Sequence, residues 1–100
     1  MRDQINQEAL FSDETGYYRS PSEPRRGDPV TIKFRTAHEN VDTVTLICGS
    51  FRQKMKRSYS QGLFDYYVCE WKVLDEPVHY FFEILSGEQK LYFDKLGVAD

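Results

Sequence analysis

Turn-forming residues interrupt this sequence at short intervals, and the runs between them are rich in Val, Ile, Thr, Tyr and Phe. Segments 26–29, 49–50 and 86–87 are three of these turn signals. Short β-prone runs with a turn about every 8–12 residues are typical of sandwiches and barrels. No long apolar period of 3.6 residues closed by helix caps accompanies them. The sequence therefore predicts an all-β fold.

Five runs have the length and residue types of β-strands. The clearest is segment 30–36, where Val30, Ile32 and Phe34 alternate with polar residues and so point to one face. The other four are segments 41–49, 64–73, 78–85 and 90–94. A short further strand is expected near residues 9–12. Segment 51–60 is predicted either as a strand or as an irregular excursion.

The same alternation predicts which side chains fill the space between two sheets. Besides the three residues of segment 30–36, the residues expected between the sheets are Val44, Leu46, Trp71, Tyr80, Phe82 and Ile84. About six or seven such strands predict an immunoglobulin-like antiparallel β-sandwich. We expect one domain over residues 1–100, with a flexible tail over residues 1–7.

Composition disfavours several classes of function. Lys and Arg number 13 against 16 Asp and Glu, so the formal net charge is -3, whereas a protein that binds nucleic acid needs a basic surface. No apolar run approaches the roughly 18 residues of a membrane span. The N-terminus lacks the apolar core of a signal peptide, so we expect a cytoplasmic protein. Cys48 and Cys69 are accordingly expected as reduced thiols, with a disulfide as the alternative.

The carboxylates and histidines give no pattern that predicts catalysis or metal binding. Glycoside hydrolysis needs two carboxyl groups about 5–9.5 Å apart across a substrate. Strand alternation gives no reason for the candidate carboxylates to converge, and these are Asp65, Glu70, Asp75, Glu76 and Glu83. His38 and His79 lack the spacing of zinc ligands. We therefore predict no catalytic residue, no metal and no cofactor in this chain.

One local run is basic although the whole chain is acidic. Residues 52–57 include four Lys or Arg side chains, and Phe51 and Tyr59 flank them. Basic and aromatic residues together are typical of single-strand nucleic-acid grooves, but the run is short and no RNA-binding motif accompanies it. We expect a solvated strand or loop. The second interpretation is contact with an acidic surface of the same polypeptide or of a sister subunit.

The seven Tyr and seven Phe are too many for a sandwich of this size to bury completely. Tyr17 and Tyr18 fall in an expected loop, and Tyr59 falls in another. Exposed aromatic rings stack on the apolar faces of sugars and anchor protein–protein contacts. A purely structural role, filling the space between sheet edges, is an equally good interpretation of each.

Five segments, taken in order, resemble a known family. They are 30–36, 40–46, 63–67, 78–82 and 90–93, the last followed by Gly97. The sequence resembles the N-terminal domain, carbohydrate-binding module family 34, of neopullulanase, cyclomaltodextrinase and maltogenic amylase type α-amylases. The resemblance covers roughly residues 9–97.

This resemblance implies a β-sandwich that precedes a (β/α)8 catalytic barrel in the same polypeptide. The chain is then an excised, non-catalytic domain of an enzyme that hydrolyses α-1,4 and in some members α-1,6 bonds of starch, pullulan or cyclodextrins. The family further implies a dimer in which this domain covers the active site of the sister subunit. Partners would be the two barrels and α-glucan oligosaccharides, with neither nucleic acid nor a membrane involved.

Departures from the family pattern limit which residues can be assigned. After the second strand the family often has an aromatic loop with Trp, but here Phe51 and Arg52 stand without it. Tyr67 replaces another usual Trp, and the calcium ligands of some relatives have no matching cluster. Candidate residues for sugar binding or for covering the active site are Phe51, Arg52, Tyr17, Tyr18 and Tyr59. The alternative function is an immunoglobulin-like protein-interaction module that binds no sugar.

Overall fold

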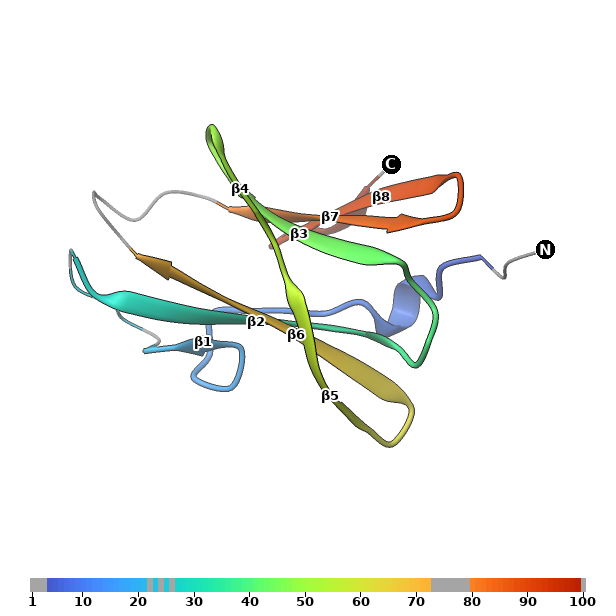
Figure 1. Cartoon of the computed structure of the whole chain (residues 1–100), viewed down its shortest axis with the longest axis horizontal. Helices are drawn as coiled ribbons and strands as arrows, with labels where there is room; N and C mark the ends of the chain where they lie inside the picture. The colour runs from blue at the N-terminus through green and yellow to red at the C-terminus, as the bar shows by residue number, and fades with distance from the viewer. Residues whose placement is uncertain (1–3, 22, 24, 26, 73–79, 100) are drawn as a thin grey trace.

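Two antiparallel sheets pack face to face in the computed structural model, which describes residues 4–21, 23, 25, 27–72 and 80–99 (Figure 1). A short 3-10 helix, η1 (Gln7–Ala9), precedes them. The first sheet has the order β1 (Arg19–Ser20), β2 (Pro29–Ala37), β6 (Phe64–Lys72) and β5 (Lys56–Gln61). The second has the order β4 (Phe51–Lys54), β3 (Thr43–Cys48), β7 (Phe81–Ser86), β8 (Gln89–Asp94) and β9 (Gly97–Ala99). The predicted all-β, immunoglobulin-like antiparallel sandwich is confirmed.

Aromatic rings from both sheets meet in the core. Phe34 of β2 lies 4.5 Å from Phe82 of β7 and 5.4 Å from Phe93 of β8, between ring centroids. Val30 and Ile32 are fully buried on the same side of β2, as their alternation predicts. The predicted positions of Val44, Leu46, Phe82 and Ile84 in the core are also confirmed, and Tyr67 and Cys69 lie there with them. The side chain of Trp71 and residues 78–79 lie outside the described residues.

Segment 51–60 is a strand that changes sheets. β4 pairs with β3 in the second sheet, and β5 pairs with β6 in the first, with only Met55 between them. Met55 is buried, and its N–H donates to the carbonyl of Val44 at 2.7 Å. Figure 1 shows this ribbon descending from one layer to the other. The basic run of the sequence thus occupies the outer edge of both sheets.

The N-terminal segment differs from expectation. The predicted strand at 9–12 is wrong, because residues 7–9 form η1 and only Phe11 makes a single bridge, to Arg35. The side chain of Asn6 caps η1 by accepting the N–H of Glu8, a local bond that favours a turn over a strand. Within the expected flexible tail over residues 1–7, Ile5 is buried and donates its N–H to Gln89 Oε1. Strands β1 and β9 were not predicted.

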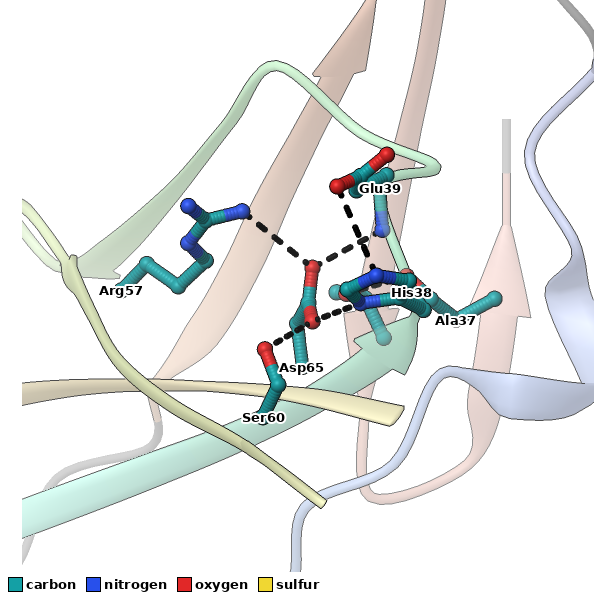
Figure 2. Close-up of polar contacts among 7 residues, drawn as sticks. Ala37, His38, Glu39, Arg57, Ser60 and Asp65 are labelled. Carbon is teal, nitrogen blue, oxygen red and sulfur yellow. Dashed lines mark hydrogen bonds and ion pairs between the residues drawn. The ribbon is translucent and has the colours of Figure 1, made fainter. Parts of the chain in front are cut away.

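A buried carboxylate ties two turns together at one end of the sandwich (Figure 2). Asp65, 1% exposed, accepts hydrogen bonds from Ser60 Oγ at 2.6 Å, His38 Nδ1 at 2.7 Å and the N–H of Glu39 at 2.9 Å. Arg57 lies 3.7 Å from the same carboxylate. Asp65 therefore fastens the β2–β3 turn to the β5–β6 hairpin. His38 has a structural partner here.

Burial opposes the charge on Asp65, but its hydrogen bonds favour that charge. Desolvation alone raises the pKa of the carboxyl group. The bonds from Ser60, from the backbone of Glu39 and from His38 outweigh it and hold the pKa of Asp65 below its ordinary value.

Replacing Asp65 with Asn tests this network. Asp65→Asn keeps one acceptor oxygen but faces donors with an amide NH2, so buried donors lose their partner. We expect a loss of about 2 kcal/mol in the free energy of unfolding, measured by urea denaturation. Glu70→Gln, at an exposed carboxylate of the same strand, is the control. An equal, small effect of both substitutions would contradict the role of Asp65.

The pH dependence of stability follows from the same lowered pKa. Because the folded-state pKa lies below the unfolded value of about 3.9, the contribution of Asp65 is complete above that pH and declines as pH falls further. The stability difference between wild type and Asp65→Asn should therefore be constant near neutrality and shrink below about pH 4. Urea titrations at a series of pH values measure it. A difference that grows on acidification would show that the pKa is raised instead.

Candidate functional site

Three of the five predicted site residues come together on the outer face of the first sheet. Tyr17 and Tyr18 precede β1, Tyr59 lies on β5, and Tyr66 of β6 lies between them. We call these four residues the tyrosine cluster. Tyr59 stacks on Tyr66 at 4.7 Å between centroids, Tyr17 stacks on Tyr66 at 6.0 Å, and Tyr17 contacts Tyr18 at 4.9 Å.

A lysine holds the tyrosine cluster together. The ammonium of Lys33, on β2, lies 3.9 Å from the centroid of Tyr17 and donates a hydrogen bond to the hydroxyl of Tyr59 at 2.9 Å. The hydroxyls of Tyr17 and Tyr59 are 3.1 Å apart and hydrogen-bonded. Cations over aromatic faces are attracted to the ring quadrupole. The two tyrosines therefore hold a fixed position although they come from separate loops and strands.

Arg35, the next outward-facing residue of β2, extends this surface. Its guanidinium lies 4.3 Å from the ring centroid of Phe64 and 5.4 Å from that of Phe11, and its Nε donates to the carbonyl of Ala9. Phe11 in turn contacts Tyr18, with 5.1 Å between centroids. Alternating cations and rings thus cover the outer face of β2.

Burial within the cluster differs from ring to ring. Tyr18 and Tyr66 are under 9% exposed, and desolvation raises the pKa of each hydroxyl. Tyr17 is 45% exposed and Tyr59 is half-buried. Tyr17 and Tyr59 can therefore present ring surface and hydroxyls to a ligand, while Tyr18 and Tyr66 serve mainly as support.

The other two predicted site residues lie on the second sheet. Phe51, at the start of β4, packs against the buried residues of the hydrophobic core. Arg52 pairs with Glu83 of β7 at 2.9 Å. The structure therefore does not bring Phe51 and Arg52 together with the tyrosine cluster.

Sequence reasoning missed Lys33 and Tyr66. A usable signal existed, because alternation in 30–36 points Lys33 outward and only one residue of the Tyr66-Tyr67 pair can face the core. What alternation cannot give is the sheet order, which places β5 beside β6 and so puts Tyr59 over Tyr66.

The carboxylates considered for catalysis do not converge: two of the described ones make structural contacts, and the third is exposed elsewhere on the first sheet. Asp65 is buried in its network, Glu83 is paired with Arg52, and Glu70 is exposed on β6. Asp75 and Glu76 lie outside the described residues, as does His79. Within the described ranges, no group of three or more His, Cys, Asp or Glu residues could hold a metal ion.

Cys48 and Cys69 are both free and buried. Desolvation raises the pKa of the Cys69 thiol to about 11, which makes it a poor nucleophile near neutral pH. Across the part of the chain that the structure describes, no helix is both long and apolar enough to cross a membrane.

Comparison with known proteins gives one family and one fold. A family model described as "Alpha amylase, N-terminal ig-like domain" matches residues 17–100. Among solved structures, the chain is similar to one named "Cyclomaltodextrinase", with a TM-score of 0.72 and 22% sequence identity. The match covers 85% of this chain but 15% of the other. A search of curated proteins found no match.

Removing the charge of Lys33 tests how the tyrosine cluster is held. Lys33→Met keeps the aliphatic stem but loses the cation and its hydrogen bond to Tyr59. We expect a loss of about 1 kcal/mol in the free energy of unfolding, measured by urea denaturation. Lys56→Met, at an exposed position of β5, should leave stability nearly unchanged. If both variants lose the same amount, Lys33 does not hold the cluster.

Proposed function

This chain belongs to the family of α-amylase N-terminal Ig-like domains, and from that premise we propose that it is the non-catalytic N-terminal domain of an α-glucan hydrolase. The family match over residues 17–100 carries the proposal. The similar fold within a much longer cyclomaltodextrinase supports it. The catalytic carboxylates would then lie in a (β/α)8 barrel of the same polypeptide, in the cytoplasm.

The reading frame downstream of Asp100 tests this assignment most cheaply. Barrel strands with catalytic carboxylates there support the proposal. An unrelated continuation would favour the protein-interaction module instead. The isolated chain should release no reducing sugar from starch, and release of sugar would contradict a non-catalytic role.

Within the full enzyme, we propose that the domain shapes the active site and aids dimerisation by covering the barrel of a sister subunit. The five segments that resemble neopullulanase-type domains support this role. Phe51 is packed against the core, so the exposed residues Gly49 and Ser50 of the β3–β4 turn are the better candidates for reaching a neighbouring cleft.

We also propose that the tyrosine cluster binds α-glucans weakly. Tyr17 and Tyr59 offer ring surface together with hydroxyls that are hydrogen-bonded to each other, and Lys33 donates a further bond to the hydroxyl of Tyr59. Aromatic faces contact the apolar C–H surfaces of sugars, and hydroxyls exchange hydrogen bonds with theirs. Because few contacts must offset the loss of ligand freedom, the affinity should be about millimolar.

Titration with β-cyclodextrin tests this binding. Tyrosine fluorescence or NMR shifts of the wild-type chain should change saturably, and Tyr17→Ala should weaken binding about tenfold because it removes the most exposed ring. Leu63→Ser, at an exposed leucine of the β5–β6 turn, is the control and should bind like wild type. If neither the fluorescence nor the NMR shifts of the wild-type chain change, the proposal that the tyrosine cluster binds carbohydrate is wrong.

A further inference from the structure

A pocket of about 200 Å³ opens where three distant segments meet, namely residues 12–14, the start of β7 and the β8–β9 turn. The aromatic residues Tyr80, Phe81, Phe82 and Phe93 line it. Phe82 and Phe93 are 3% and 8% exposed and belong to the hydrophobic core. Because core packing holds them, this part of the lining is rigid. Leu96 also lines the pocket and is 89% exposed, which places it at the mouth.

Three carboxylates lie at the rim of this pocket. Among the described residues of the lining, Asp13, Glu14 and Asp94 are acidic and Lys95 is basic, while Arg19 pairs with Glu14 from outside the lining. Turn contacts fix each of them: Asp13 and Asp94 accept the N–H two residues on, at 3.0 and 2.8 Å, and Glu14 pairs with Arg19 at 3.2 Å. Each of these contacts uses one carboxylate oxygen. Because an ionised carboxylate has about four acceptor positions, the rim keeps the capacity to accept bonds from a ligand.

An aromatic lining under a rim of acceptors fits a neutral polyhydroxylated ring. The apolar face of a pyranose packs on aromatic surface, and its hydroxyls donate to carboxylates. The net negative rim disfavours phosphorylated or other anionic ligands. We propose, on the basis of the function proposed above, that this pocket binds the terminal glucosyl unit of a linear α-glucan.

Pocket size favours the chain end. Pockets for drug-sized ligands span roughly 300–1,000 Å³, so a pocket of about 200 Å³ accepts one ring. A unit inside a glucan chain carries two glycosidic bonds that leave in different directions, whereas a terminal unit carries one. A closed cyclodextrin has no terminal unit. The pocket should therefore accept linear maltooligosaccharides and reject cyclic ones.

A series of ring contacts connects the pocket to the tyrosine cluster. Tyr17 contacts Tyr18, Tyr18 contacts Phe11, and Phe11 lies 6.4 Å from Phe93 of the pocket lining, between centroids. Phe11 is 36% exposed. Ring contacts therefore link the two surfaces through Phe11 and Tyr18.

The test is an NMR titration of the 15N-labelled chain with maltotriose and, separately, with β-cyclodextrin. Maltotriose should shift the amides of residues 12–14, 80–82 and 93–96, whereas β-cyclodextrin should leave them unchanged. Two variants probe the lining without touching the core. Leu96→Ser removes the apolar mouth, and Asp94→Asn removes a charge while its amide oxygen still accepts the N–H of Leu96.

Each of these variants should weaken maltotriose binding at least fivefold. Leu63→Ser is the matched control, since Leu63 is another highly exposed leucine at a hairpin turn, and it should bind like wild type. Tyr17→Ala should weaken β-cyclodextrin binding, and it should leave unchanged the shifts that maltotriose causes at the pocket amides.

Three results overturn the proposal. If both sugars shift only the tyrosine cluster, the pocket proposal fails while carbohydrate binding stands. If β-cyclodextrin shifts the pocket amides as strongly as maltotriose does, selection of chain ends fails. If neither sugar shifts any amide, the pocket and the sugar-binding part of the proposed function both fail, whereas the non-catalytic domain assignment still depends on the downstream reading frame.

Discussion

The contact of Phe34 with Phe82 and Phe93 is the interaction on which the rest of the structure depends. It joins β2 of the first sheet to β7 and β8 of the second, at centroid distances of 4.5 and 5.4 Å. Buried aromatic rings of this kind supply much of the apolar area of a small core. The same strand, β2, carries Lys33 and Arg35 on its other face, and Phe93 also lines the pocket. The core thus positions both candidate binding surfaces.

Alternation within single strands was enough to predict the fold and most of the core. Segments 30–36, 64–73 and 90–94 were placed within a few residues of β2, β6 and β8, because their apolar period is set by the pleat itself. The short strands β1 and β9 escaped prediction because two or three residues carry no period. The strand predicted near residues 9–12 failed because the local bond from Glu8 to Asn6 favours a 3-10 turn.

The candidate site was predictable only in part, for a physical reason. Tyr17, Tyr18 and Tyr59 could be chosen as exposed aromatics, but their convergence depends on sheet order and on β5 crossing to the first sheet. The resemblance indicates Phe51, and the pairing of β4 with β3 places this residue opposite Cys48 and against the core. The pocket escaped prediction because its lining comes from three segments that no short pattern connects.

The central claim is that this domain serves an α-glucan hydrolase without taking part in bond cleavage. The most direct measurement compares the full-length enzyme with a version lacking residues 1–100, by sedimentation and by relative activity on β-cyclodextrin and starch. The account predicts that the truncated enzyme retains hydrolysis of small linear substrates, loses the proposed dimer and changes its preference between β-cyclodextrin and starch. An unchanged oligomeric state and an unchanged preference would contradict it.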